Sequence, residues 1–323
     1  MGGYCKTPEG YTFYDGPVYT VGWEGTDDFY VFELEEMANW FKERRNVHKM
    51  TLGSAPTDGG NLFMTPEERD EVLNREPELK KFIRQVLGSY EFINGVKRYC
   101  FWLVDASPKD IKRSKILHER VEKVKAFRLA SVRGKTQRQA NCPHLFAEMR
   151  QPATDYMLIP RHSSSKRYYI PMGYMSSDVI VTDAAYSLPK ATPYHFGIIT
   201  SRVHMAWVRR VCGRLRDDYR YNNTVGYNTF CWPKSNPWQV KRIEDTGQKI
   251  LDVRAKYPEC TFADLYDEVS MPPDLRKAHN ENDAAVLEAY GLPVDMDEED
   301  IIDHMFKLYY EALAENKEQE CRK

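Results

Sequence analysis

Residues 156–171 read Tyr156-Met157-Leu158-Ile159-Pro160-Arg161-His162-Ser163-Ser164-Ser165-Lys166-Arg167-Tyr168-Tyr169-Ile170-Pro171, in which two apolar runs flank a polar segment. These runs predict a strand over 156–160 and another over 168–171, because apolar and aromatic side chains suit a pleated, partly buried surface. A third strand is predicted over 179–182, where the chain reads Val-Ile-Val-Thr. Short strands separated by turns that contain Ser and Gly indicate a compact sheet in the middle of the sequence.

Helices are predicted on both sides of this sheet region. A turn signal at 57–61 is followed by a cap, a proline and an acidic first turn at 65–68, which is typical of a helix start. A longer helix is predicted from Ser107 and Pro108, with apolar residues at helical spacing up to Phe127 and with lysines and arginines on its outer face. A third helix is predicted over 204–215.

The character of the sequence changes after Trp232-Pro233, where three helices separated by Pro and Gly are predicted, roughly at 237–256, 273–290 and 297–316. The expected fold class is therefore α+β, with a mixed sheet-containing body followed by an all-helical region. We expect an unassigned N-terminal segment at 1–49, which includes short strands at 18–23 and 29–32. A domain at 50–233 and a helical region at 234–323 follow.

Length and composition favour an intracellular protein of two domains. The chain has 323 residues, and it contains no run of eighteen apolar residues that could cross a membrane. Its seven cysteines are scattered without a CxxC pair, so reduced thiols are expected. Cys142 and His144 have no second pair of ligands nearby, and no metal site is predicted. A cytoplasmic location and no contact with a membrane are expected.

Charge is segregated along the chain, although the formal net charge is only −2. The segment 109–138 carries eleven basic residues against three acidic ones, and a second basic cluster comprises Arg209, Arg210, Arg214 and Arg216. The segment 295–320 is acidic and is expected to face away from nucleic acid. Basic segments indicate a polyanionic partner, whereas the alternative is that they are solvated helix faces.

Several ordered strings resemble the C-terminal half of MmeI-like (type IIL) restriction-modification enzymes, from about Met50 to Leu313. The strings are Pro56-Thr57-Asp58-Gly59-Gly60-Asn61-Leu62, Gly88-Ser89-Tyr90-Glu91-Phe92-Ile93-Asn94-Gly95, Arg98-Tyr99-Cys100-Phe101-Trp102-Leu103, Phe127-Arg128-Leu129-Ala130-Ser131, Arg150-Gln151-Pro152, Leu158-Ile159-Pro160-Arg161, His195-Phe196-Gly197-Ile198, His204-Met205-Ala206-Trp207, Cys212-Gly213-Arg214-Leu215 and Tyr227-Asn228-Thr229-Phe230-Cys231-Trp232-Pro233. Two features depart from the family pattern: residues 1–49 do not match it, and Cys231 replaces the usual proline.

The resemblance implies a target recognition domain followed by a helical region of a restriction-modification adenine methyltransferase. Enzymes of this family also carry a nuclease, a helical connector and a methyltransferase that uses S-adenosylmethionine. An adenine methyltransferase needs an acidic or amide residue before Pro-Pro and an aromatic, together with a glycine loop for the cofactor, and neither is found. The nearest string, Ser235-Asn236-Pro237-Trp238, is expected to cap a helix. No catalytic or cofactor-binding residue is therefore expected in this chain, and S-adenosylmethionine is expected in the missing methyltransferase domain.

Two further motifs are interpreted as having no catalytic or cofactor-binding role. Asp70 with Glu78-Leu79-Lys80 imitates a nuclease motif but is expected to lie on a solvated helix. Gly22 and Gly25 lack the setting of a cofactor loop and are interpreted as a turn.

Double-stranded DNA is the partner that the resemblance implies, together with a methyltransferase domain or subunit. Base readout is assigned to Ser165, Lys166 and Arg167 in the polar connection and to Gln137, because Arg and Lys suit guanine whereas Gln suits adenine. Contacts with DNA phosphates are assigned to Arg133, Lys135, Arg138, Arg150, Arg214 and Tyr219. The alternatives are a solvated loop for the first set and internal ion pairs for Arg150 and Arg214.

Two other functions stay open from the sequence. One is a truncated C-terminal fragment with residual DNA binding. The other is a self-sufficient enzyme with its active site in residues 1–49, which are too few for a methyltransferase domain.

Overall fold

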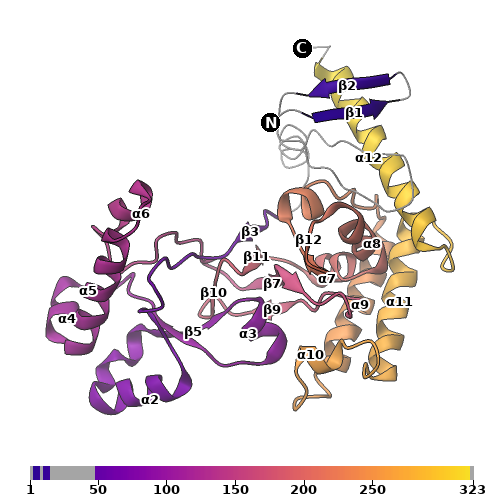
Figure 1. The fold of residues 1–323 in the computed structure, drawn as a ribbon. Helices are drawn as coiled ribbons and strands as arrows, with labels where there is room; N and C mark the ends of the chain where they lie inside the picture. Colours follow the sequence, from indigo (N-terminus) through magenta and orange to yellow (C-terminus); the bar gives the residue numbers. More distant parts are fainter. Residues whose placement is uncertain (1–2, 8–9, 15–47, 321–323) are drawn as a thin grey trace. The chain divides into compact units, whose positions relative to one another are not determined.

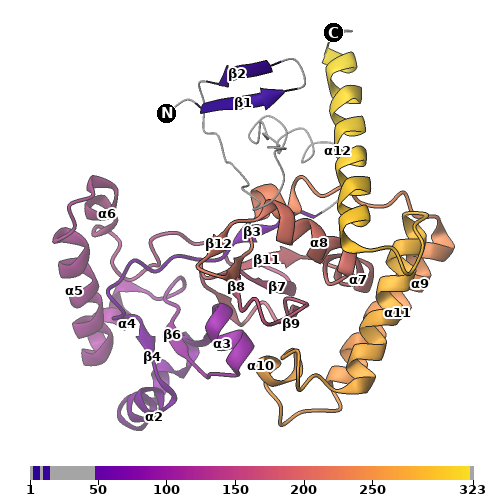
Figure 2. The same ribbon diagram turned by 45° about the vertical axis from the view of Figure 1, so that its right-hand side comes forward.

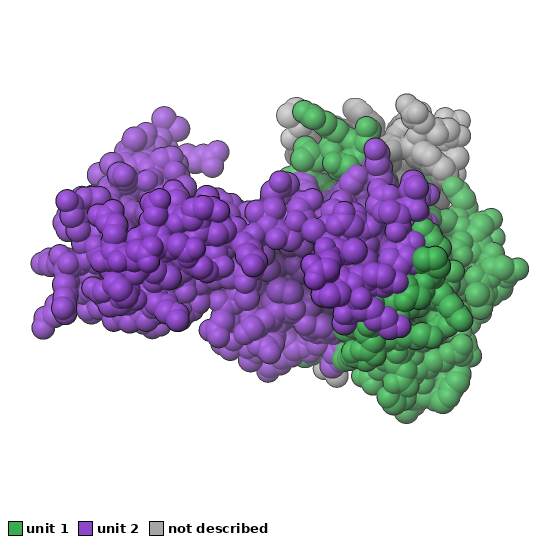
Figure 3. All heavy atoms as spheres, turned by 90° about the horizontal axis from the view of Figure 1, so that it is seen from below, with its two compact units in different colours: residues 1–49, 193–253, 273–323 green, residues 50–192, 254–272 purple. Residues whose placement is uncertain are grey.

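The structure is a computed structural model that describes residues 3–7, 10–14 and 48–320 (Figure 1). The predicted strands 18–23 and 29–32 and the turn at Gly22 and Gly25 lie outside these residues. The chain forms two compact units, coloured separately in Figure 3. Unit 1 comprises residues 1–49, 193–253 and 273–323, and unit 2 comprises residues 50–192 and 254–272.

Unit 2 contains two four-stranded sheets. The first has the order β10 (Ile180–Val181), β5 (Ile83–Leu87), β6 (Tyr99–Phe101), β4 (Phe63–Met64), and only its β10–β5 pair is parallel. The second is antiparallel and has the order β3 (Thr51–Leu52), β11 (Ala185–Pro189), β7 (Tyr156–Pro160), β9 (Gly173–Met175). Strand β7 is buried along its whole length, which agrees with its apolar sequence.

The polar segment after β7 differs in part from the prediction. A two-residue strand, β8 (His162–Ser163), starts it, and a turn follows. The predicted strand over 168–171 is wrong, because these residues form no ladder and the next strand is β9. Tyr169 and Ile170 are buried all the same, and Pro171 has no N–H to donate to a ladder. The apolar character of 168–171 thus reports burial rather than a strand.

The helices of unit 2 are short except for one. They are α2 (Pro66–Arg75), the 3-10 helix η1 (Pro77–Phe82), α3 (Ser89–Asn94), α4 (Pro108–Arg113), α5 (Lys115–Leu129), α6 (Gly134–Gln139) and α10 (Phe262–Leu265). The predicted cap of α2, Thr65, forms a capping box with Glu68. The single helix predicted from Ser107 is divided at Ser114, whose hydroxyl accepts a hydrogen bond from Leu117 N and so caps a new helix.

Two hydrophobic cores support unit 2. One joins Leu62, Phe101, Leu117 and Val124, so it packs α5 against the first sheet. The other contains Phe92 and Leu158, from α3 and β7. Figures 1 and 2 show α4, α5 and α6 at the opposite end of this unit from β7 and β9.

Unit 1 is mainly helical in its described residues. It contains the hairpin β1 (Gly3–Thr7) and β2 (Gly10–Tyr14), then α7 (Pro193–Ile199), α8 (Arg202–Val211), the hairpin β12 (Arg214–Leu215) and β13 (Asp218–Arg220), the π-helical turn η2 (Asn223–Tyr227), α9 (Pro237–Arg254), α11 (Pro273–Ala289) and α12 (Glu298–Glu320). Both units together confirm the α+β class with a helical C-terminal region.

One helix of unit 1 is shorter than predicted. The helix expected over 204–215 ends at Val211, because Cys212 adopts an extended conformation before Gly213. Trp207 of α8 is fully buried, and its ring lies 5.2 Å from that of Phe306 in α12. Arg209, expected in a basic cluster, instead forms an ion pair with Glu298 at the start of α12, with Nε and Oε1 2.6 Å apart. The acidic and basic segments of unit 1 therefore neutralise each other at this point.

Candidate nucleic-acid interface

Arg128 is the most deeply buried cation in the basic segment 109–138, with 1% of its surface exposed. All five of its N–H donors reach main-chain oxygens at 2.7–3.1 Å. The acceptors are the carbonyls of Pro56, Thr57, Gln139, Cys142 and Leu145. Burial lowers its pKa, and the nearby Asp58 carboxylate opposes that effect. Arg128 therefore joins the end of α5 to two loops, and its predicted place on the outer face of the helix is wrong.

A second arginine of this segment also has a structural role. Arg120 Nη1 donates to the carbonyls of Asn61 and Phe63, at 3.0 and 2.8 Å. The turn at 57–61 is closed by the buried Asp58 carboxylate, which accepts from Gly60 N and Leu62 N. Since Arg120 and Arg128 bind main-chain oxygens, fewer cations of the segment face solvent than its composition suggests.

The segment 133–139, predicted from the sequence to contact DNA, contains the helix α6 (Gly134–Gln139), which Arg133 precedes as the N-cap residue. Arg133 and Arg138 are exposed at its two ends. Gln137, assigned to base readout, is exposed but donates from its amide to Ser131 O at 2.8 Å. Val132 is 99% exposed beside Arg133. The corner between α5 and α6 thus presents cations to solvent on a backbone that Arg128 anchors.

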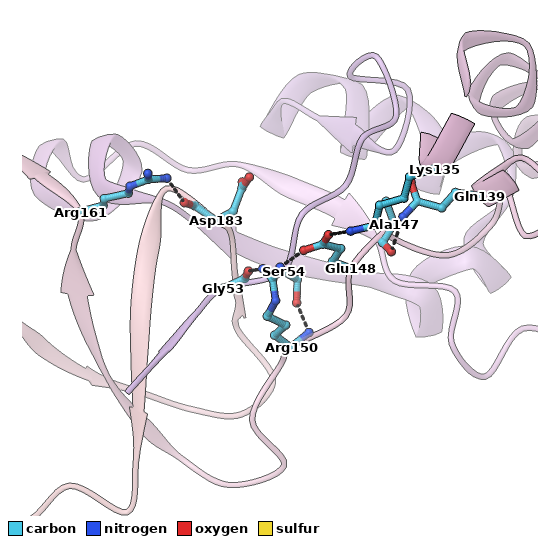
Figure 4. Close-up of polar contacts among 9 residues, drawn as sticks. All are labelled: Gly53, Ser54, Lys135, Gln139, Ala147, Glu148, Arg150, Arg161 and Asp183. Atoms are coloured by element: carbon cyan, nitrogen blue, oxygen red, sulfur yellow. Dashed lines mark hydrogen bonds and ion pairs between the residues drawn. The ribbon is translucent and has the colours of Figure 1, made fainter. Parts of the chain in front are cut away.

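Glu148 brings two of the predicted phosphate-binding residues together (Figure 4). Its Oε1 lies 2.6 Å from Lys135 Nζ, and its Oε2 forms an ion pair with Arg150 Nη2. Arg150 also donates from Nη1 to Gly53 O at 2.8 Å. We call Lys135, Glu148 and Arg150 the Glu148 cluster. It connects α6 to the segment that precedes β7.

The strand segment beside this cluster requires a glycine. Gly53 N donates to Ala185 O, and Ser54 N donates to Val181 O. A Cβ at position 53 would lie 2.2 Å from Thr182 O, which is too close for any side chain. The hydroxyl of Ser54 accepts from Arg150 N at 2.9 Å. Close approach of two backbones at Gly53 therefore positions Arg150.

Gln151 lies inside the unit rather than toward solvent. Its amide nitrogen donates to the carbonyls of Ser177 and Val179, and its amide oxygen accepts from Val181 N at 2.9 Å. Tyr156 donates to the same Val179 carbonyl, and burial raises the pKa of this tyrosine. Gln151 thus orders the loop before β10.

The polar connection after β7 begins at a serine hub. The hydroxyl of Ser89 donates to Ala184 O and accepts from Arg161 N and His162 N. Arg161 Nη1 approaches Asp183 O at 3.4 Å (Figure 4). Farther along, the N–H groups of Lys166 and Arg167 donate to Ser164 Oγ and Ser164 O.

These bonds close a turn at the tip of the connection. Ser165 and Lys166 are exposed there, whereas Arg167 is partly buried. A rigid hub at one end and a tight turn at the other therefore present Lys166 to solvent.

Two predicted residues lie in unit 1. Arg214 is exposed in β12, and its guanidinium lies 4.4 Å from the ring centroid of Tyr219 in β13. Tyr219 is only 5% exposed. The structure therefore brings Arg214 and Tyr219 together as a stacked pair.

The predicted residues thus fall into three groups. Within unit 2, the segment 133–139 and the Glu148 cluster include five of them, and the turn at 164–167 includes three more. Glu148 was missed by the sequence analysis. Its place beside Met149 and Arg150 in an irregular segment gave no signal, since its partner Lys135 is thirteen residues away.

The described residues contain neither a metal-binding cluster nor a membrane-spanning helix. Among residues 3–7, 10–14 and 48–320, no group of three His, Cys, Asp or Glu side chains could bind a metal ion. No helix within these ranges is long and apolar enough to span a bilayer.

Comparisons with known proteins agree with the strings found in the sequence. Residues 38–234 match the family model of the MmeI target recognition domain, and residues 235–316 match that of the MmeI C-terminal domain. The chain is 36% identical over 266 residues to DNA methyltransferase A of Bacillus subtilis (strain 168), which covers 82% of this chain and 30% of that protein.

A solved structure of the type IIL restriction-modification enzyme MmeI in complex with DNA is 38% identical in sequence, with a TM-score of 0.82. The match covers 84% of this chain and 36% of that one. The chain thus spans about a third of the length of the proteins it matches. The resemblance inferred from the sequence is confirmed, and the chain belongs to the MmeI family, of which it contains the target recognition domain and the C-terminal domain.

Proposed function

We propose that this chain selects the DNA sequence on which an adenine methyltransferase of the restriction-modification type acts. One observation carries the proposal: the target recognition fold of this chain matches that of MmeI, whose structure was solved with DNA bound. A module of this kind needs cations for phosphates and directed polar side chains for base edges. Unit 2 offers both kinds in its exposed residues.

Phosphate contacts are assigned to exposed cations around the α5–α6 corner. Arg133 and Arg138 are exposed, and Arg128 anchors the backbone on which they lie. Such contacts set affinity and register without reading sequence. Arg214, stacked on Tyr219, is a further candidate in unit 1.

Base readout is assigned to the turn after β8. Lys166 is exposed, and its backbone is bonded to Ser164. A lysine or arginine that enters the major groove can donate to O6 and N7 of guanine. Ser165 and Arg167 belong to the same turn and are assigned with it. Gln137 stays a proposed reader of adenine, which requires its amide to leave Ser131 O.

We further infer that methyl transfer is performed by a methyltransferase domain or subunit that binds S-adenosylmethionine. This is supported by the relative, DNA methyltransferase A, and by the lack of an acidic or amide residue before Pro-Pro in this sequence. The residues of this chain then bind and orient the duplex. They neither bind the cofactor nor exchange a proton with the base.

A binding measurement tests the proposal. The purified chain is titrated with a fluorescent duplex between 50 and 200 mM salt, and we expect affinity to fall by about threefold for each phosphate contact over this range. Selection from a randomised duplex library should then yield a defined site. Equal affinity at both salt concentrations, or a library that stays random, would contradict the proposal.

Substitutions at Lys166 and Arg167 test whether these residues read the bases. Lys166→Ala and Arg167→Ala should alter the selected sequence and weaken the preferred site by about 1–3 kcal/mol for each lost bidentate contact. Lys112→Ala, an exposed lysine of α4, is the matched control and should leave the preference unchanged. A uniform loss of affinity for all sequences in the Lys166 and Arg167 variants would reject them as readers.

An assay with labelled S-adenosylmethionine tests whether methyl transfer requires a separate methyltransferase domain or subunit. The chain alone should transfer no methyl group from S-adenosylmethionine to a duplex that contains the selected site. Methyl transfer by the purified chain would show that it is an enzyme in its own right.

A further inference from the structure

Glu148 carries one negative charge between Lys135 and Arg150, two cations that the sequence predicts to contact DNA phosphates. Lys135 Nζ lies 2.6 Å from one carboxylate oxygen, and Arg150 Nη2 pairs with the other. The side chains of Glu148 and Arg150 are about one-third exposed, and that of Lys135 is 69% exposed. The Glu148 cluster is therefore within reach of a ligand from solvent, and its net charge is +1 rather than +2.

The backbone of Glu148 is fixed. Glu148 and Ala55 exchange two hydrogen bonds, at 2.9 and 3.0 Å. The amide of Gln139 donates to Ala147 O at 3.0 Å, and Arg128 binds the carbonyls on the preceding loop. The carboxylate therefore extends from a rigid segment, and its backbone does not move with Lys135 or Arg150.

The two cations differ in their freedom to move. Arg150 is bound through its main-chain N–H to Ser54 and through Nη1 to Gly53 O. Lys135 reaches Glu148 through a long side chain from α6 and is the more exposed of the two. The ammonium group of Lys135 can thus leave the carboxylate and bind another anion, while Arg150 stays in place.

We propose that Glu148 is an internal competitor of the DNA phosphate, which occupies Lys135 and Arg150 in the free protein and lowers the affinity of the chain for duplex DNA. The inference rests on the proposed function. A phosphate that approaches both cations would come close to the fixed carboxylate, and two like charges at such a distance repel. Either Lys135 leaves Glu148 for the phosphate, or the contact is not made.

This arrangement acts on the electrostatic part of binding alone. Phosphate contacts are independent of sequence, so Glu148 weakens binding to target and random duplexes by the same factor. A glutamate that read a base would behave differently, because a carboxylate in the major groove accepts from the N4 amino group of cytosine. The effect on sequence preference separates these two roles.

The experiment compares the full chain with its Glu148→Gln variant. A random-sequence duplex is titrated between 50 and 200 mM salt. At 50 mM salt the variant should bind about three- to tenfold more tightly, and its plot of log K against log salt should be steeper by about 0.9–1.8, the value for one or two released counterions. Thermal unfolding of both proteins checks that the fold is unchanged.

Two controls make the result specific. Glu119→Gln removes the same charge from an exposed pair with Lys115 and should raise affinity much less. Lys135→Ala should change binding little in the natural chain, where Glu148 occupies Lys135. The same substitution should cancel most of the gain in the Glu148→Gln background.

The possible outcomes distinguish a failure of this inference from a failure of the proposed function. Equal gains from Glu119→Gln and Glu148→Gln, or additive effects of the substitutions at 135 and 148, would overturn the inference and leave the proposed function intact. A changed sequence preference in Glu148→Gln would make Glu148 a base reader and also overturn it. If the natural chain does not bind duplex DNA at any salt concentration, the proposed function itself fails.

Discussion

Arg128 shows how one side chain can determine the conformation of two loops. Its sequence context, a helix rich in Lys and Arg, predicts a solvent-facing cation. The structure instead buries the guanidinium among five carbonyl oxygens. Only arginine has five donors in a planar arrangement, so no other residue can satisfy all five acceptors.

Substitution of Arg128 should therefore destabilise unit 2 without a direct loss of DNA contacts. Arg128→Met leaves the carbonyls without donors and should lower the free energy of unfolding by about 3–5 kcal/mol. Arg128→Lys retains at most three donors, so its free energy of unfolding should lie between those of the natural chain and Arg128→Met. Urea denaturation measures the effect, and Arg138→Met, which removes an exposed arginine, should cost less than about 0.5 kcal/mol. Similar losses in both variants would contradict the anchoring role.

His195 gives the chain a defined response to acid. Burial, followed by the nearby His48, lowers the pKa of His195 from 6.5 to about 4. The ring stays neutral in the folded chain while the unfolded chain binds a proton. The unfolded state therefore binds more protons between about pH 6.5 and 4, and stability falls as pH decreases through this window.

The measurement is urea denaturation of the natural chain and of His195→Phe at pH 7, 6, 5 and 4. We expect the difference in unfolding free energy between the two proteins to shift in favour of the variant as pH decreases. His118→Gln, at an exposed position of α5, should follow the natural chain. Parallel pH profiles for the natural chain and His195→Phe would refute the assignment.

Helix α6 is the element in which the basic segment meets solvent. Its sequence, with a glycine and polar residues, predicts no helix, but six residues form a helix that follows the anchored end of α5. A short helix of this kind is stabilised mainly by its tertiary contacts, which its sequence does not reveal. Here these contacts are Arg128 to Gln139 O and the Gln139 amide to Ala147 O.

The cations of α6 should differ in their share of the salt dependence. Arg133→Ala and Arg138→Ala should each reduce the slope of log K against log salt by about 0.9, the value for one phosphate contact. Lys135→Ala should reduce it less, because Glu148 already occupies Lys135. Fluorescence titration with a random duplex at four salt concentrations measures all three. A larger effect at Lys135 than at Arg133 and Arg138 would contradict this order.

The whole chain is organised differently from a simple succession of domains. The two MmeI family models meet at residues 234 and 235, where the sequence also predicts a boundary. Unit 1, however, contains residues on both sides of that position. In this unit Trp207 of α8 packs on Phe306 of α12, and Arg202 N donates to Asp283 of α11 at 2.7 Å.

Removal of residues 235–323 should therefore unfold part of the recognition region. Without α11 and α12, the apolar face of α8 loses its cover, so we expect fast amide exchange over 193–234 and slow exchange in β5 and β7 of unit 2. Hydrogen exchange of the truncated and full chains measures this. Equal protection of α8 in both would show that the region 50–233 folds independently, as the boundary predicted from sequence implies.

The sequence by itself determined the family, the α+β class, strand β7, the cap and first turn of α2 and the change to helices after Trp232-Pro233. These features depend on side chains close together in the sequence, such as apolar runs, caps and prolines. The tertiary structure alone decided that Arg128 is buried, that Lys135 and Arg150 meet at Glu148, and that α8 is covered by α12. In each of these cases the partners are distant in sequence, and a charged side chain is compatible with either solvent or a buried acceptor until the fold places that acceptor beside it.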